Sequence, residues 1–298
     1  MFNRGISENF VKALKGWNHW EEIIKDPHLF VAIRDEYINI YFQGCSLFKI
    51  SYKEQLVLET HYKYLVRPSA KHPYVSWVGD SPAIKDLINE IFVEALDVEA
   101  LKKSSGWYAQ REKTGLHKIL KCNGNVIDVE VALSPESEDE ADTAESGVEG
   151  RRAADRIDFA AIQKRDGKPR TVFFEAKRFE NKELRSQTHE PRVIEQAKRY
   201  KDFIDKHLPD FKRSYGRVCK NLVDLGLPRV DPLVVEVAHN PEYLDVDSDI
   251  RLVVFDFDQD QRVGKKWKEH REPLEKYFGD RLLLKGSPSE FTAGISKY

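Results

Sequence analysis

The sequence has few cysteines and no long apolar stretch. Its three cysteines, Cys45, Cys122 and Cys219, lie far apart and form no C-x-x-C pair or Cys/His spacing, so neither a zinc knuckle nor a disulfide framework is expected. No stretch approaches the roughly 18 uninterrupted apolar residues that a membrane span needs, and the first residues lack a basic region followed by an apolar run. The sequence therefore predicts a cytoplasmic protein without an export or anchoring signal.

A surplus of charge of one sign is also missing. The chain has 48 Lys and Arg against 50 Asp and Glu, a net charge of −2, which argues against a protein that coats nucleic acid through bulk charge but leaves local basic patches open. The 298 residues are 41% hydrophobic and 11% aromatic, which is enough to bury a core in one large domain or two modest ones. Fibrous, collagenous and disulfide-stapled classes are excluded.

Several common catalytic motifs are absent. The chain has no P-loop, no H-E-x-x-H pair and no G-x-S-x-G elbow, which disfavours NTPase, zinc hydrolase and acyl-transfer functions. The segment from Asp256 to Asp260 starts like a calcium loop, but it lacks the required glycine and has Trp267 in place of the final glutamate. We expect this segment to be a polar strand exit.

The first part of the chain predicts an α+β accessory domain over residues 1–105. Apolar residues recur at helical spacing over 7–25 and again over 83–101, and short apolar runs separated by turns over 29–66 predict an antiparallel meander. The aromatic residues of this meander serve either as a core, which is the more common use, or as a stacking platform for bases.

Residues 106–298 predict an α/β domain, because strands and helices alternate there. A hairpin at Asp166-Gly167 joins two of the strands. We expect helices over 106–120, 181–207, 211–225 and 261–278, and strands over 126–133, 156–162, 171–177, 232–238, 251–256 and 281–284.

Three charged residues interrupt the apolar strands of the hairpin. Asp158 and Glu175 lie among apolar neighbours, and Lys177 follows Glu175 by two residues, which places both on one face of the strand. Two neighbouring buried carboxylates are costly unless a cation neutralises them, and oxygen ligands suit Mg²⁺ or Mn²⁺. A metal held by Asp158, Glu175 and the backbone carbonyl of Ala176 would polarise a phosphate, and Lys177 would orient or deprotonate the attacking water.

This pattern resembles the PD-(D/E)XK nuclease superfamily. Arg156-Ile-Asp158, a hairpin and Glu175-Ala-Lys177 follow one another as in that superfamily, with Ile157 in place of the nominal proline. The element Gln196-Ala-Lys-Arg-Tyr200 resembles the Q-x-x-x-Y motif of its RecB-like and lambda-exonuclease-like branch. The resemblance covers about residues 106–258. It implies a restriction-endonuclease-like mixed central sheet flanked by helices, and a site with Asp158, Glu175 and Lys177 as catalytic residues and with Gln196 and Tyr200 as substrate-positioning residues.

Two further features extend this interpretation. The superfamily tends to have a glutamate on the helix before the first core strand, and Glu112 is the matching candidate for an additional metal-shell carboxylate. A second E-x-K triplet, Glu180-Asn-Lys182, lies in a polar setting and is interpreted as a solvated helix start.

The region around the expected site is basic, although the whole chain is nearly neutral. Residues 160–220 contain seventeen Lys and Arg against nine Asp and Glu. Phosphate contacts by basic side chains give salt-sensitive binding without sequence preference. The candidates for such contacts are Arg178, Lys182, Arg185, Arg192 and Arg199.

The sequence thus predicts a Mg²⁺-dependent nuclease acting on DNA, of the kind found in prokaryotic antiviral defence or DNA repair. An RNA-directed nuclease and a noncatalytic nucleic-acid-binding or assembly module on the same fold remain alternatives. The N-terminal domain is the expected surface for a protein partner. An acidic loop over 134–150 is expected to be mobile and solvated, and it could compete with DNA for the basic surface.

Overall fold

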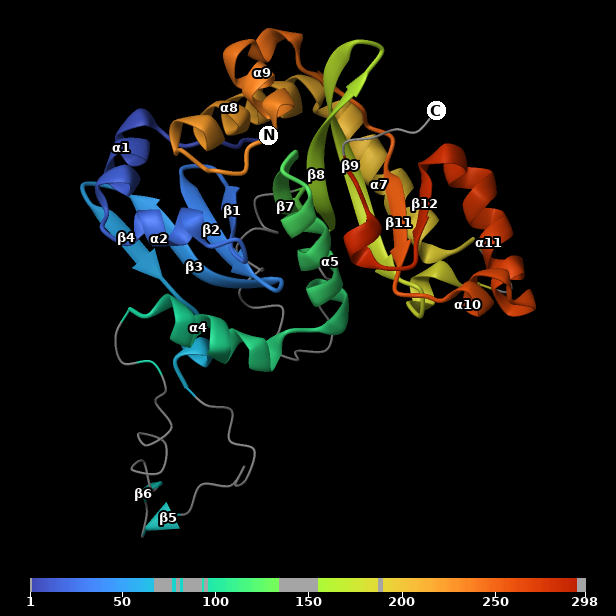
Figure 1. Ribbon diagram of the computed structural model, residues 1–298, viewed down its shortest axis with the longest axis horizontal. Coiled ribbons are helices and arrows are strands. Elements are labelled where there is room, and N and C mark those ends of the chain that lie inside the picture. Colours follow the sequence, from blue (N-terminus) through green and yellow to red (C-terminus); the bar gives the residue numbers. More distant parts are fainter. Residues whose placement is uncertain are drawn as a thin grey trace.

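The structure, a computed structural model, describes residues 2–66, 77–78, 81–82, 93, 96–133, 155–186 and 190–293. Within these residues the chain has a mixed α/β fold, with a multi-strand mixed sheet flanked by helices (Figure 1). The expected acidic loop over 134–150 and most of the expected helix over 83–101 lie outside the described residues. Among the described helices, none combines the length and apolarity needed to cross a membrane.

The N-terminal part contains the expected antiparallel meander. Its sheet has the strand order β1-β2-β3-β4, and every neighbouring pair is antiparallel, which confirms the prediction. Tyr41, Phe48 and Tyr64 are buried, so these three aromatic residues serve as core. The strands are β1 (Phe30–Ile33), β2 (Tyr37–Phe42), β3 (Cys45–Tyr52) and β4 (Leu56–Glu59).

The helix expected over 7–25 is interrupted. It forms α1 (Glu8–Gly16) and α2 (Trp20–Lys25), because the backbone is extended at Trp17. The break lets Trp20 turn inward, where its indole N–H donates to the carbonyl of Leu225 at 3.2 Å. The remaining elements of this part are β5 (Trp77–Val78), β6 (Ser81–Pro82) and α4 (Val98–Ser105).

The central sheet has the order β12-β11-β9-β8-β7, with the short β10 pairing with β9. β8 is antiparallel to both of its neighbours, β7 and β9, whereas β9, β11 and β12 are parallel. Asp166 and Gly167 both have positive φ angles, of 51° and 77°, as a tight two-residue hairpin turn requires. The strands are β7 (Val126–Ala132), β8 (Arg156–Arg165), β9 (Lys168–Arg178), β10 (Asp245–Val246), β11 (Arg251–Phe255) and β12 (Leu282–Lys285).

Helices cover both faces of the central sheet (Figure 1). Side chains of α5 pack on the face that contains Phe159 and Phe174, while α7, α8, α9 and α11 contribute to the core on the face that contains Ala160 and Phe173. The alternation of side chains along a strand explains how both faces are apolar. The helices are α5 (Arg111–Cys122), α7 (Arg192–Lys206), α8 (Leu208–Asp224), α9 (Pro232–His239), α10 (Gln259–Val263) and α11 (Lys265–Phe278).

Two segments of the chain differ from the structure that the sequence predicts. Residues 232–238 were expected to be a strand, but they form helix α9: the side chain of Asp231 accepts the N–H of Leu233, and Pro232 occupies the first turn, where its missing N–H costs nothing. The helix expected over 181–207 begins only at Arg192, because a short 3₁₀ turn at Lys182–Leu184 and Pro191 precede it.

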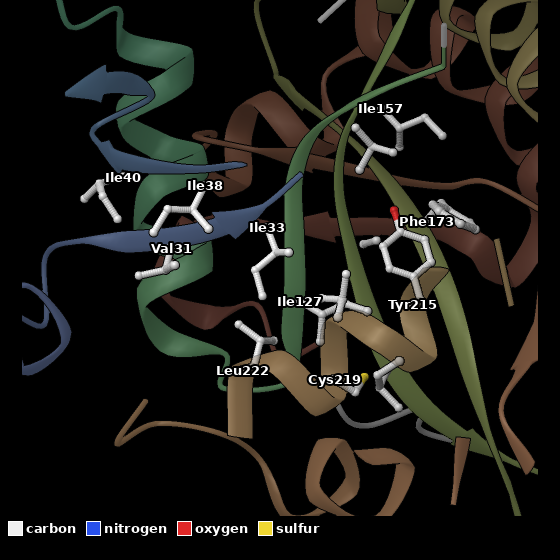
Figure 2. Packing of buried hydrophobic residues seen from close by; sticks show 14 of the residues in the cluster. Val31, Ile33, Ile38, Ile40, Ile127, Ile157, Phe173, Tyr215, Cys219 and Leu222 are labelled. Carbon is white, nitrogen blue, oxygen red and sulfur yellow. The ribbon is translucent and has the colours of Figure 1, made fainter. Parts of the chain in front are cut away.

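The hydrophobic core is continuous across the expected domain boundary at residue 105. Figure 2 shows Ile33 and Ile38 of the N-terminal sheet gathered with Ile127 of β7 and with Leu222 of α8. The division into domains at residue 105 stays a prediction, but the two parts share one apolar cluster.

Candidate active site

The candidate site lies where the hairpin strands β8 and β9 separate. The two strands are paired from Arg165, which faces Lys168, to Phe159, which faces Phe174. Beyond this last pair, the Oδ2 atom of Asp158 accepts the backbone N–H of Ala176 at 2.7 Å. The carboxylate of Asp158 therefore takes the place of a backbone partner at the end of the ladder, beside the C-terminal half of β9.

Glu175 and Lys177 lie together on one face of β9, as the sequence predicted. The Nζ atom of Lys177 is 2.8 Å from Oε1 of Glu175, and Glu175 and Lys177 are 2% and 8% exposed. The same Nζ is 2.8 Å from Oε2 of Glu183, in the 3₁₀ turn that follows β9. One buried ammonium thus joins two carboxylates from consecutive elements.

Burial dominates the electrostatics of the two strand carboxylates. Burial, followed by the negative charge of Glu175, raises the pKa of Asp158 well above its usual value. Burial also raises the pKa of Glu175 to about 7, although the nearby Lys177 opposes the shift. For Lys177 the balance is reversed: burial lowers the pKa, but the charges of Glu175 and Asp158 outweigh it and raise the pKa above the usual value.

These pKa shifts indicate that the site has more negative than positive charge. Lys177 is an ammonium at neutral pH, so it donates hydrogen bonds and cannot accept a proton from water. The Oε2 atom of Glu175 is buried and has no hydrogen-bond partner, and such orphaned oxygens are rare in proteins. An added cation would relieve both the orphaned oxygen and the proximity of the two carboxylates.

Carboxylate oxygens are the metal ligands that the candidate site offers to Mg²⁺ or Mn²⁺. Carboxylate oxygens are the preferred hard ligands of Mg²⁺, which is held through one or two protein carboxylates and keeps several waters. Asp158 and Glu175 meet this requirement. Within the described ranges, however, no group of three or more His, Cys, Asp or Glu side chains lies close enough together to hold a metal ion. The predicted role of the Ala176 carbonyl stays a prediction.

Glu112 reaches the end of β9 from α5. Its Oε2 atom accepts the backbone N–H of Arg178 at 3.3 Å and the side-chain amide of Asn181 at 2.9 Å. Its negative charge is one of the smaller causes that raise the pKa of Glu175. Glu112 is therefore close to the site, and its hydrogen bonds hold the chain where β9 ends.

Gln196 and Tyr200 share one face of α7, as their spacing predicted. The amide of Gln196 donates to the hydroxyl of Tyr200 at 2.6 Å, and this hydroxyl donates to the carbonyl of Arg156 at 2.6 Å. Tyr200 is fully buried. Burial and the charges of Glu175 and Asp158 raise the pKa of Tyr200, so it is a neutral hydrogen-bond donor. In this arrangement it fixes the start of β8, two residues before Asp158.

The five basic residues proposed to contact phosphates differ in availability. Arg178 is bound to Asp256 at 2.8 Å, and Arg199 is paired with Asp155 at 3.0 Å. Arg185 lies over the rings of Phe179 and Trp267. The exposed side chains of Lys182 and Arg192 form no ion pair with any residue that the structure describes.

Glu183 belongs to the site, although the sequence does not indicate it. Its neighbour Glu180 is 65% exposed and lies at the turn, which agrees with the interpretation of Glu180 and Lys182 as a solvated segment. Glu183 bends back toward Lys177 through the 3₁₀ turn, and a polar sequence context gave no signal of that contact.

Comparison of the chain with protein-family models, curated proteins and solved structures finds no match. The resemblance to the PD-(D/E)XK superfamily therefore stays a prediction from the motifs, and the functional argument depends on the geometry of the residues.

Proposed function

We propose that this protein is a metal-dependent nuclease that hydrolyses phosphodiester bonds in DNA, on a restriction-endonuclease-like fold. The proposal depends chiefly on one observation: Asp158 and Glu175 lie together at the separating ends of two strands, with a buried oxygen of Glu175 lacking any hydrogen bond. Lys177, which also pairs with Glu183, leaves these two buried carboxylates short of positive charge. A divalent cation would supply it.

Asp158 and Glu175 are the proposed ligands, and a bound Mg²⁺ or Mn²⁺ would supply Lewis-acid polarisation of the phosphate. Lys177, as an ammonium, orients the attacking water and stabilises negative charge on the phosphate. Glu183 and Glu175 fix the position of its Nζ. Gln196 and Tyr200 hold the start of β8, and Lys182 and Arg192 are the available cations for the DNA backbone.

The test is cleavage of circular and linear DNA, single- and double-stranded, and of RNA, with Mg²⁺, Mn²⁺ or EDTA. We expect metal-dependent cleavage of DNA by the wild type and none by Lys177→Ala, which should still bind DNA. The matched control is Lys12→Gln, which removes an exposed lysine of α1 away from the candidate site. Cleavage that persists in Lys177→Ala, or in EDTA, would contradict the proposal, and cleavage of RNA alone would reassign the substrate.

A noncatalytic nucleic-acid-binding or assembly module on the same fold is the second candidate. It is favoured by the pairing of Lys177 with two carboxylates and by the involvement of Arg178 and Arg199 in ion pairs. It predicts DNA binding without cleavage under every metal condition, with equal binding by the wild type and by Asp158→Asn.

A further inference from the structure

A cavity of about 300 Å³ lies away from the candidate active site, at the junction of the N-terminal part with α5 and α8. Most of its wall is aliphatic. The wall includes Ile23, Ile24, Leu29, Leu120, Leu222 and Val230. The volume is at the lower end of the range for small-molecule pockets, and the aliphatic wall favours an apolar ligand body.

One polar group in this wall has an unused hydrogen bond. His117 is 7% exposed, its Nδ1 accepts the backbone N–H of Gln43 at 3.3 Å, and its Nε2 is buried without a partner. Burial, with the charges of His28 and Lys121, lowers the pKa of His117 to about 4. The imidazole is therefore neutral at pH 7. Because Nδ1 accepts, Nε2 has the hydrogen, but it has no exposed surface, so His117 contributes an uncharged ring to the cavity wall.

Two cations and one carboxylate also line the cavity. Lys121 and Arg229 have no carboxylate partner among the residues that the structure describes; the Nζ of Lys121 lies 3.3 Å from Nδ1 of His28. The carboxylate, Asp26, is already bound by Lys102 at 2.7 Å and by the backbone N–H of His28 at 2.7 Å. The cavity therefore combines an aliphatic wall with a positive polar end.

We propose that this cavity binds a small organic monoanion with an apolar body, such as a medium-chain carboxylate. The apolar body lies against the aliphatic wall, and the acidic group accepts hydrogen bonds from Lys121 or Arg229. An anion fits better than a neutral ligand, because it supplies negative charge to two cations that have no carboxylate partner among the described residues. A cavity that holds only water would show no preference for anions.

The proposal is independent of the nuclease function, so binding is measured directly. Octanoate is titrated into the full-length protein by calorimetry, with octanol and octylammonium as uncharged and cationic probes of the same length. We expect one site for octanoate, with octanol and octylammonium binding at least about tenfold more weakly, since one charge-assisted hydrogen bond is worth about that factor. Equal binding of octanol and octanoate, or no binding of octanoate, would overturn the proposal.

Two variants on α5 form a matched pair. Lys121→Gln removes an exposed cation of the cavity and should weaken the binding of octanoate about tenfold. Lys118→Gln removes an exposed lysine outside the cavity and should leave the binding of octanoate unchanged. Unchanged affinity in both Lys121→Gln and Arg229→Gln would overturn the assignment of the acidic group.

Discussion

Arg34, in the turn after β1, binds the carboxylate of Asp128 in β7, and both side chains are buried. A second nitrogen of Arg34 donates to the carbonyl of Val129 at 2.6 Å, and Asp128 also accepts the hydroxyl of Tyr215 at 3.2 Å. The Nε atom of Arg4 lies 3.5 Å from Oδ2 of Asp128 and completes the network. This network of buried charges fixes the N-terminal sheet to the central sheet and to α8.

Removing one partner of this network should be strongly destabilising. Arg34→Met leaves Asp128 with less positive charge in a buried position, and we expect a loss of about 3–5 kcal/mol in the free energy of unfolding, measured by urea denaturation. Lys25→Met, which removes an exposed ion pair with Glu21, should leave the free energy of unfolding almost unchanged, because water screens exposed pairs. A similar small loss in both variants would show that the buried network contributes little.

Divalent cations should stabilise the folded protein if Asp158 and Glu175 bind them. With Mg²⁺ at about ten times its Kd, the stabilisation is about 1.4 kcal/mol, which corresponds to a rise of roughly 2–4 °C in Tm. The measurement is a thermal melt with Mg²⁺ or EDTA. Asp158→Asn keeps an oxygen that can accept the N–H of Ala176 but loses the charge, so its Tm should not respond to Mg²⁺. A wild-type Tm that is equally insensitive would count against the metal site.

Glu183 should act as a positioning residue for Lys177. In Glu183→Gln the ammonium loses one of its two charged partners, and we expect kcat to fall about tenfold with little change in KM, as is typical for supporting residues of a site. The control is Glu180→Gln, which removes an exposed carboxylate three residues earlier that pairs with Arg178. Steady-state cleavage kinetics of both variants test the role, and an unchanged kcat in Glu183→Gln would refute it.

His117 should make the protein less stable in acid. Its pKa in the folded protein is about 4, below the usual 6.5, so between these values the unfolded chain binds more protons than the folded one. The stability from this residue is full above about pH 6.5 and is lost as the pH falls to 4, a change of about 3 kcal/mol. Urea denaturation between pH 4 and 7 should show this slope in the wild type and a flatter one in His117→Gln; parallel slopes would exclude His117 as the cause.

The sequence predicted the features of the site that depend on local periodicity. Alternation along a strand placed Glu175 and Lys177 on one face, and the spacing of four on a helix placed Gln196 beside Tyr200. The Asp166-Gly167 hairpin brought Asp158 opposite the end of β9 in the same local way. Periodicity did not distinguish a strand from a helix at residues 232–238, because a short apolar run of this kind is compatible with both.

Only the tertiary structure decided which distant groups meet. Glu183 turns back to Lys177, Arg34 reaches Asp128, and Glu112 holds the end of β9 rather than lying free beside it. Such contacts depend on how the chain closes between elements far apart in sequence, and charged residues in polar segments show no periodicity that would reveal a partner. The sequence by itself determined the hairpin strands β8 and β9 and the strand and helix faces that carry the site, because these depend on neighbours within one turn or one strand. Burial and pairing, which set the charges of those residues, were decided by the packing of whole layers.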